Sequence, residues 1–308
     1  MPTGVCDRLG LFSVRRRIMS KVLVVGNLTL DIIHGVDHYP VEDEELRAHS
    51  QRYQRGGNAA NTAVVLAQHG HRVSFVGTRA DDSHAQGLAA ELAAADIDLQ
   101  YCQVIRAAAC PLSCILHNEK TGSRTIVHYR DLAEYDAAGF AGIPLAEYDG
   151  FHFEGRNLPQ LVTMLEQVQR ARVDQPILLE VEKPRPGIEA AFAYADVLLF
   201  SRVYAMAEGC RAAGELFDRV QARHPQGILI CTWGEQGAYA RTPDGADLHA
   251  PALPVREICD SVGAGDTFNA GVIHGLLSGK HLHDTLLYAN ALAAKKLQQP
   301  GFAGLAGG

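Results

Sequence analysis

The sequence of 308 residues lacks the features that mark several classes of protein. It has no apolar run of about 20 residues, and its first residues are basic without the apolar stretch that a signal peptide requires. The 28 basic residues, against 35 acidic ones, form no long run apart from Arg15-Arg16-Arg17. A net charge of −7 further argues against nucleic acid or an anionic membrane as the main partner. We expect a soluble cytoplasmic protein.

Clustered cysteines and histidines are also lacking. The seven cysteines are scattered without a CxxC pair, and the fourteen histidines contain no HExxH. A local pair such as His281 and His283 is typical of a solvated loop rather than a metal site. We therefore expect reduced cysteines and no structural zinc.

The sequence does have enough apolar residues, 47%, to bury the core of one large domain. Residues 1–20 are polar and are expected to be a disordered leader, with the folded part starting near Met19 and covering residues 21–304. The closing GFAGLAGG is expected to be loose.

Short apolar runs alternate with helical patterns along this domain. Strands are expected at residues 21–26, 72–77, 151–155, 176–182, 196–201 and 227–234, and helices at 58–70, 85–97, from 159, after 265 and at 286–296. This alternation predicts an α/β fold in which helices cover both faces of a parallel sheet.

Two segments, about 34–54 and 101–130, break the alternation. Both are polar, alternating and rich in charged and aromatic residues, as half-exposed strands are. We expect them to form a small sheet over one edge of the main domain. The first segment lies just before Gly56-Gly57, which indicates a lid over a site, although an irregular sheet edge would give the same pattern.

The stretch DSVGAGDTFNAG, residues 260–271, places glycines and a carboxylate where a loop becomes a helix. A helix N-terminus has unpaired N–H groups and partial positive charge, so it binds phosphate well. Gly263, Ala264 and Gly265 would supply these N–H groups. Asp266, in the first turn, either favours the helix dipole only or accepts a proton from an alcohol held beside the phosphate.

Other nucleotide-binding motifs do not fit this stretch. The sequence contains no GxxxxGK[ST], and Phe268 occupies the third glycine position of GxGxxG. The stretch also lies near the C-terminus and not after the first strand. An oxidoreductase with a dinucleotide fold is therefore disfavoured.

A second group of polar residues follows the first strand. Asp31 comes a few residues after it, and Gly56-Gly57-Asn58-Ala59-Ala60-Asn61 begins the first helix. Asn58 and Asn61 share a helix face. A carboxylate and two amides suit a polyol such as a sugar, whereas a helix cap and a turn would explain each residue singly.

Together these motifs resemble the ribokinase family of sugar kinases, also called the phosphofructokinase-B type. The resemblance spans residues 21 to about 304 and is carried by GGNAANTA (56–63), TGSRTIV (121–127), HFEGRN (152–157), VEKPR (181–185), TWGEQGA (232–238) and DSVGAGDTFNAG (260–271). GGN and GAGD are typical of the whole family. EGRN, VEKPR and WGEQGA are similar to its ketohexokinase branch, whose members phosphorylate the 1-hydroxyl of fructose.

The resemblance implies a three-layer α/β/α Rossmann-like main domain with a small β-sheet lid. It implies ATP, magnesium and transfer of the γ-phosphoryl group to a sugar hydroxyl. It also implies a homodimer, because the lids of two subunits clasp each other in that branch.

The resemblance also implies roles for individual residues. Asp266 would be the base, with Gly263, Ala264 and Gly265 as the anion hole. The sugar would be held by Asp31, Gly57, Asn58 and Asn61, with Asp43 reaching from the lid into a neighbour's site. The phosphates and nucleotide would contact Arg124, Arg156, Arg202, Trp233, Glu235, Gly237 and Asn290.

The metal ligands stay open. Many relatives carry an Asn-x-x-Glu motif that organises magnesium, but this chain has Ser201-Arg202-Val203-Tyr204 there. Magnesium is expected to bind through water and phosphate, near Glu182. The potassium site of some relatives would fall near Asp260 and the loop before Gly301.

The expected chemistry suits even a weak base. A helix N-terminus lowers the pKa of an acid such as Asp266. Phosphoryl transfer is largely dissociative, so the hydroxyl proton leaves late, when the oxygen has become acidic. A kinase for another sugar, a sugar acid or a nucleoside, and a catalytically silent sugar-binding protein, remain as alternatives to a fructose kinase.

Overall fold

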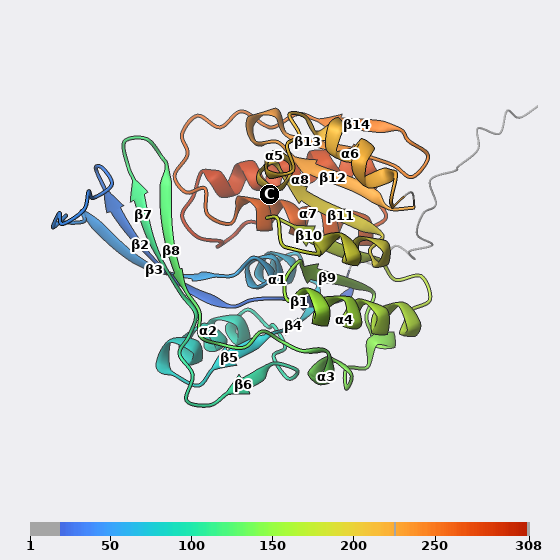
Figure 1. Ribbon diagram of the computed structural model, residues 1–308, viewed down its shortest axis with the longest axis horizontal. Coiled ribbons are helices and arrows are strands. Elements are labelled where there is room, and N and C mark those ends of the chain that lie inside the picture. The colour runs from blue at the N-terminus through green and yellow to red at the C-terminus, as the bar shows by residue number, and fades with distance from the viewer. Residues whose placement is uncertain (1–18, 225, 307–308) are drawn as a thin grey trace, which may run out of the picture.

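An eight-stranded sheet lies at the centre of the computed structural model, which describes residues 19–224 and 226–306 (Figure 1). Most of the predicted leader, residues 1–18, lies outside the described residues. From one edge to the other the strands are β14 (Asp247–Ala250), β13 (Ala238–Arg241), β12 (Ile228–Thr232), β11 (Val197–Ser201), β10 (Ile177–Val181), β9 (Gly150–Glu154), β1 (Lys21–Val25) and β4 (Arg72–Val76).

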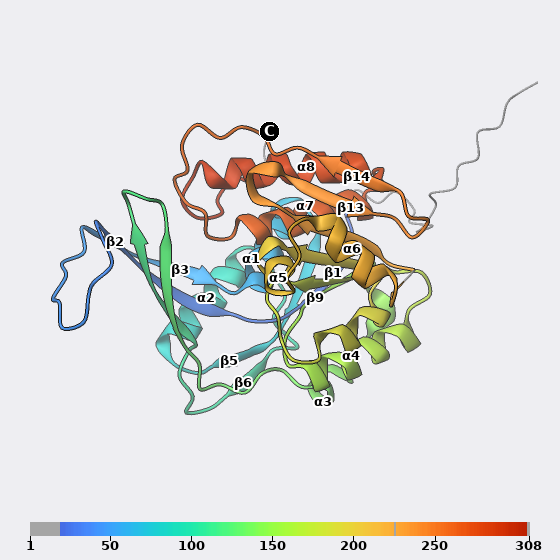
Figure 2. The ribbon, with the colours of Figure 1, turned by 45° about the horizontal axis from the view of Figure 1, so that its top comes forward.

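Alternate residues of these strands face opposite sides of the sheet, and both sides are apolar. Val22 and Val24 of β1 pack on one side, whereas Leu23 and Val25 pack on the other. The first side is covered by α1 (Asn58–Gln68), α2 (Ser83–Ala94), α7 (Ala264–Leu277) and α8 (Leu282–Leu297). The second side is covered by α3 (Ala137–Phe140), α4 (Leu158–Ala171), α5 (Arg202–Ala207), α6 (Ala213–Gln221) and the short 3₁₀ helices η1 (Leu145–Glu147) and η2 (Ile188–Tyr194) (Figure 2). The predicted three-layer arrangement is confirmed.

The predicted parallel sheet continues at one edge into two antiparallel strands. Strands β4, β1, β9, β10, β11 and β12 are parallel to one another, but β13 is antiparallel to β12 and β14 is antiparallel to β13. The connection from β12 to β13 contains only η3 (Gly234–Gln236) and its flanking residues. A connection this short closes a hairpin, since a parallel neighbour needs a long crossover.

A second sheet of four strands stands beside the first, and we call it the lid sheet (Figure 1). Its order is β3 (Ser50–Gly56), β2 (Thr29–Val36), β7 (Leu112–Asn118) and β8 (Arg124–Tyr129). Strand β2 thus starts before residue 34, directly after β1. Within residues 101–130, β6 (Gln103–Ile105) does not join the lid sheet but pairs with β5 (Thr78–Ala80).

The architecture brings several chain segments to one edge of the main sheet. Parallel strands all end at the same edge, and such an edge is where α/β proteins bind ligands. Helices α1 and α7 both begin there and pack against each other. No helix in residues 19–224 and 226–306 has both the length and the apolar character needed to cross a bilayer.

Candidate active site

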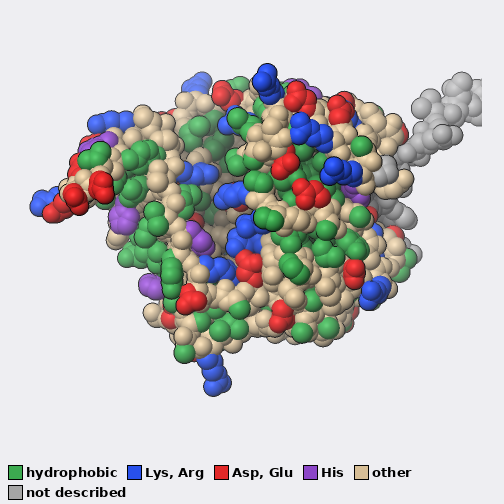
Figure 3. Space-filling model, viewed as in Figure 1, with side chains coloured by type: hydrophobic (Ala, Val, Ile, Leu, Met, Phe, Trp, Pro, Cys, Tyr) green, Lys and Arg blue, Asp and Glu red, His purple; other side chains and the backbone are tan. Residues whose placement is uncertain are grey.

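A cavity of about 480 Å³ lies between the lid sheet and the ends of the parallel strands. Figure 3 shows the hollow, with Lys and Arg side chains gathered along it. The predicted site residues that line the cavity are Asp31, Gly57, Asn58, Asn61, Arg124, Arg156, Gly263, Gly265 and Asp266.

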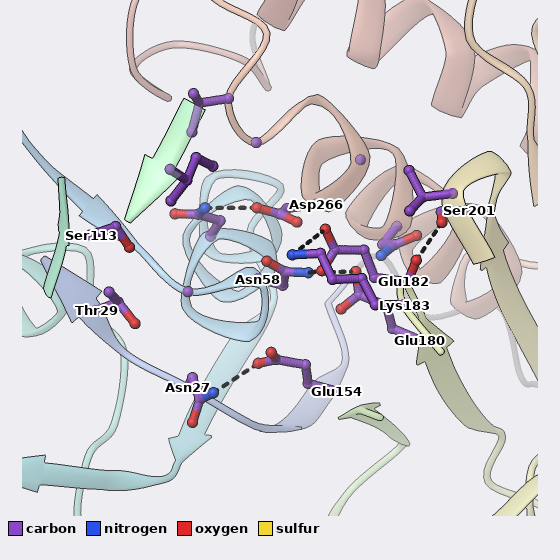
Figure 4. Close-up of a pocket in the computed structure, with 18 of the residues that line it drawn as sticks. Asn27, Thr29, Asn58, Ser113, Glu154, Glu180, Glu182, Lys183, Ser201 and Asp266 are labelled. Carbon is purple, nitrogen blue, oxygen red and sulfur yellow. Dashed lines mark hydrogen bonds and ion pairs between the residues drawn. The ribbon is translucent and has the colours of Figure 1, made fainter. Parts of the chain in front are cut away.

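Asp266 is held in the first turn of α7, with only 6% of its surface exposed. The Asn61 Nδ2 donates to its Oδ2 at 2.6 Å, and the Thr62 hydroxyl donates to its backbone carbonyl at 3.2 Å. The Asn61 Oδ1 in turn accepts a hydrogen bond from Arg55. Figure 4 shows the Asp266 carboxylate directed into the cavity. These contacts fix the orientation of the carboxylate.

The basicity of Asp266 differs from the sequence expectation. Burial raises its pKa to about 7, against the hydrogen bond from Asn61, and the nearby Glu182 and Glu154 raise it further. The sequence indicated that the helix N-terminus lowers this pKa, whereas burial and the neighbouring carboxylates act in the opposite direction. Asp266 is thus a stronger base than a surface aspartate.

The N-terminus of α7 is shaped by Gly263. This residue has φ +81°, and a Cβ added there would lie 2.2 Å from the Phe302 ring. Only glycine meets both conditions. Gly263 and Gly265 line the cavity, whereas Ala264 does not. Gly263 therefore lets the turn pack against Phe302, and Gly265, in the first turn of α7, lines the cavity together with Asp266.

The N-terminus of α1 reaches the same cavity. Gly57 has φ +96°, and a Cβ there would lie 2.2 Å from the Asn27 carbonyl oxygen. The Asn58 Nδ2 donates to Glu180 at 3.0 Å and to Glu182 at 3.1 Å. Two helix N-termini therefore face one cavity, and both favour a negatively charged ligand.

Asp31 faces the cavity from strand β2 of the lid sheet. Burial raises its pKa to about 6, whereas the Ser113 hydroxyl and the charges of Arg55 and Arg124 oppose the rise. A Cβ at Gly56 would lie 2.4 Å from the Asp31 carboxylate, so this glycine makes room for the acid. The carboxylate can accept hydrogen bonds from two hydroxyl groups of a polyol.

Sequence reasoning missed two buried glutamates. Glu154 ends β9 and accepts a hydrogen bond from the Asn27 backbone N–H at 2.9 Å, and Glu180 lies in β10 (Figure 4). The Glu180 Oε2 has no hydrogen-bond partner among the described residues. Burial and the charges of Asp266, Glu154 and Glu182 raise its pKa well above the usual value. A carboxylate inside an otherwise apolar strand, as in ILLEV, was a usable sequence signal.

These glutamates fit magnesium held together with phosphate. Magnesium is usually bound by one or two carboxylates, several waters and substrate phosphates. The described residues include no group of three or more His, Cys, Asp or Glu side chains arranged to hold a metal by themselves. The unpaired Glu180 oxygen and the adjacent Glu182 carboxylate supply ligands of the right kind.

Basic side chains lie around the cavity, near the carboxylates of Glu154, Glu180 and Glu182. The Arg124 Nη1, on lid strand β8, donates to the Ser261 hydroxyl at 2.9 Å and so joins the lid to the turn before α7. The Arg156 guanidinium pairs with Glu134 at 2.6 Å and with Glu154 at 3.4 Å. Lys183 and Arg185 also line the cavity but were not assigned from the sequence. Arg202 begins α5, is exposed and does not line the cavity.

Four residues expected to contact the nucleotide, Trp233, Glu235, Gly237 and Asn290, are not part of the cavity lining. The first three follow β12, whose last residue, Thr232, does line it, and Asn290 lies in α8. Trp233 is buried in the core and Glu235 is exposed in η3. Gly237 has φ +89°, and the Asn290 Nδ2 donates to the Ala250 carbonyl at 2.8 Å. Asp43, between β2 and β3, is exposed and also outside the lining.

Residues 19–305 match the family described as pfkB family carbohydrate kinase. The chain is 37% identical over 293 residues to ketohexokinase of Mus musculus, covering 92% of the chain and 98% of that protein. It is 24% identical over 291 residues to ribokinase of Bacillus subtilis, covering 90% of the chain and 92% of that protein.

Solved structures confirm the fold prediction. The ribokinase of Arabidopsis thaliana complexed with ribose and ATP superposes with a TM-score of 0.76 and 21% identity, covering 92% of the chain and 94% of that structure. The ribokinase of Cryptococcus neoformans in complex with ADP superposes with a TM-score of 0.73 and 20% identity, covering 92% of the chain and 95% of that structure.

Proposed function

The chain belongs to the pfkB family of carbohydrate kinases, and we propose that it transfers the γ-phosphoryl group of ATP to a sugar hydroxyl, specifically the 1-hydroxyl of fructose. The observation that carries the proposal is the buried Asp266 carboxylate, which Asn61 orients at the N-terminus of α7 within one cavity that also contains Asp31. The likeness to mouse ketohexokinase supports a ketose as the acceptor.

The acceptor hydroxyl would lie between Asp266 and the transferred phosphate. Asp266 accepts the hydroxyl proton on its carboxylate as the new O–P bond forms and the bond from the γ-phosphorus to the oxygen shared with the β-phosphate breaks, which releases ADP. Asp31, Gly57, Asn58 and Asn61 would hold the remaining hydroxyls, since all four line the same cavity. Fixing the sugar on several groups keeps the reacting hydroxyl in place, which lowers the barrier.

The phosphates would lie on the N-terminus of α7. The amides of Gly263, Ala264 and Gly265 would donate to phosphate oxygens, because the first amides of a helix have no partner within it. Arg124 would add a positive charge from the lid, and Arg156 another from the loop after β9. Magnesium, held by phosphate oxygens with Glu180 and Glu182, would neutralise the charge that develops on the transferred group.

The nucleotide would extend past Thr232 toward the loop after β12. There Glu235 and Gly237 would border it, with Trp233 and Asn290 supporting the loop from the core and from α8. Arg202 is exposed at the start of α5 and would contact a phosphate only if the bound nucleotide extends to that helix. We propose that the chain works in the cytoplasm, where ATP is available.

The lid sheet would pair two copies of the chain. Asp31, Ser113 and His128 lie side by side and face the cavity. The next row faces the other way and is apolar, with Tyr53 60% and Val127 67% exposed; its members are Tyr53, Ile32, Cys114 and Val127. An apolar face of this kind favours association. We propose a homodimer in which these faces meet and Asp43 reaches the neighbour's site.

A substrate panel tests the proposed reaction. Purified protein is mixed with ATP and magnesium and offered ketoses, aldoses, sugar acids and nucleosides, with ADP release as the measurement. We expect release with fructose, and fructose 1-phosphate as the product by NMR. Greater turnover of a nucleoside or an aldose than of fructose would show that this compound, and not fructose, is the preferred acceptor. No release with any acceptor, together with saturable sugar binding, would show a silent sugar-binding protein.

A further inference from the structure

A fully buried lysine lies behind the proposed anion hole. Lys296, in the last turn of α8, is 0% exposed. Its Nζ lies 3.2 Å from the Asp260 Oδ2, 3.2 Å from the Asp260 carbonyl oxygen and 3.4 Å from the Gln299 carbonyl oxygen. Asp260 itself is only 2% exposed. A buried charge needs such partners, since each ion alone would lose its solvation.

The Asp260 carboxylate joins four parts of the chain. Besides Lys296, it accepts from the Val262 backbone N–H at 3.0 Å and lies 3.3 Å from the Arg52 guanidinium of lid strand β3. The Gly301 N–H approaches it at 3.5 Å. The turn before α7, the lid sheet, α8 and the C-terminal segment therefore meet at one carboxylate.

This cluster lies directly against the first residue of the anion hole. The Phe302 ring packs against Gly263, leaving no space for a Cβ. The Lys296 Nζ lies 5.3 Å from the centre of the same ring. The shape of residues 260–263 is thus fixed from behind by the lysine, the aspartate and the aromatic ring.

A potassium ion does not fit beside these groups. An alkali cation near Asp260 and the loop before Gly301 would need carboxylate and carbonyl oxygens as ligands. Three such oxygens, from Asp260 and Gln299, already accept from the Lys296 ammonium. The lysine supplies the same unit of positive charge from within the chain.

We propose that the Lys296 ammonium is a tethered cation that holds residues 260–263 in the shape that presents the anion-hole amides, so that this chain works without an added monovalent cation. Lys296 is a positioning residue, since it acts through Asp260 and Gly263. The activity part of the test rests on the proposed kinase function, but the stability part does not.

The first test compares the wild-type chain in potassium, sodium and choline chloride at about 0.1 M ionic strength. We expect the same kcat and the same melting temperature in all three salts. Potassium-dependent turnover, or a melting temperature raised by potassium over choline, would overturn the proposal. If no substrate is turned over in any salt, the proposed function fails and the melting temperatures alone decide this inference.

The second test removes the tethered charge. Lys296→Ala should lower kcat about 100-fold in choline, because it displaces the phosphate-binding turn. Potassium, ammonium or methylammonium ions should restore part of kcat and raise the variant's melting temperature, whereas Lys295→Ala, on the same helical turn, should show neither effect. A loss that no small cation restores would show a merely structural lysine. If Lys296→Ala does not fold, Lys296→Met in the presence and absence of ammonium replaces it.

Discussion

The Asn61 amide lies 2.6 Å from the Asp266 carboxylate, joining the first helix to the loop-to-helix turn near the other end of the chain. The amide can only donate through its nitrogen, so this contact orients one carboxylate oxygen and leaves the other free to face the cavity. Arg55 fixes the amide from behind. A base oriented in this way needs no rearrangement before it accepts a proton.

Replacing this carboxylate by an amide should abolish most turnover. We expect Asp266→Asn to lower kcat by about 10²- to 10⁴-fold, because the amide cannot accept the hydroxyl proton. ADP binding, measured by calorimetry, should be nearly unchanged. Asp284→Asn, which alters an exposed acid in the first turn of the next helix, is the matched control and should be fully active. Retained turnover in Asp266→Asn would refute the role of base.

The raised pKa of Asp266 should appear in the dependence of activity on pH. A base with a pKa of about 7 must be deprotonated to act. We therefore expect kcat/KM to rise with pH and to level off above about pH 7. A profile that is flat between about pH 5 and pH 8 would exclude Asp266 as the titrating group.

The same pKa should oppose stability at high pH. Its folded value, about 7, lies above the ordinary 3.8, so the folded chain binds the proton more tightly than the unfolded chain. The stabilisation that the folded chain gains from this tighter proton binding is complete below about pH 4 and is lost as the pH rises through about 7. Asp266→Asn should therefore increase the free energy of unfolding at about pH 8 by up to about 4 kcal/mol, and by less at about pH 5. Equal stabilisation at both pH values in urea denaturation would contradict the assignment.

The Asp31 carboxylate should act on sugar binding rather than on ATP. We expect Asp31→Asn to raise KM for the sugar about 10- to 100-fold, since hydrogen bonds to a charged group are lost. KM for ATP should change little. Asp37→Asn, beyond the end of the same strand and outside the cavity lining, is the control. An equal rise of both KM values would show that Asp31 acts on the whole lid.

The Arg124 guanidinium should act on the phosphates. We expect Arg124→Ala to lower kcat/KM for ATP about 10- to 100-fold, because a charge-assisted contact is removed. Steady-state kinetics at saturating sugar measure this, with the exposed Arg106→Ala as control. Unchanged kinetics would show that Arg124 does not act on the phosphates and only joins the lid sheet to Ser261.

The apolar row of the lid sheet should control association. We expect Val127→Lys to give a monomer in light scattering, because it places a charge in the proposed dimer contact. Val173→Lys introduces the same change at a residue that is 90% exposed and far from the lid in the sequence, and should leave the dimer intact. A wild-type monomer at all concentrations would contradict the proposed partner.

The main strands were predictable because their apolar runs, although short, are nearly uninterrupted and end at glycine or polar residues. The edge strands β13 and β14 were not, since AYAR and DLHA carry little apolar periodicity. Helix α6 was overlooked although its apolar residues, Leu216, Phe217 and Val220, have helical spacing. Its short length made the pattern easy to miss.

The candidate site was predictable where glycine and polar residues adjoin in sequence. Asp266 and Asn61 lie in such motifs, and their roles stay predictions, as do those of the other proposed site residues. Glu154 and Glu180 could not be assigned a place, because only the order of strands brings them together. The pairing of Lys296 with Asp260 likewise depends on how α8 packs and not on any local pattern.

The lid sheet draws all its strands from two short stretches, which cover residues 29–56 and 112–129. These stretches supply one wall of the cavity, with Thr29, Asp31, Ser113, Ile115, Ile126 and His128, while the N-terminus of α7, where we propose that phosphate binds, belongs to a different part of the chain. Exchange of these two segments between relatives would therefore change the acceptor side of the cavity together with Arg124, while the N-terminus of α7 and Asp266 stay as they are. A different acceptor surface can thus be built on an unchanged α7.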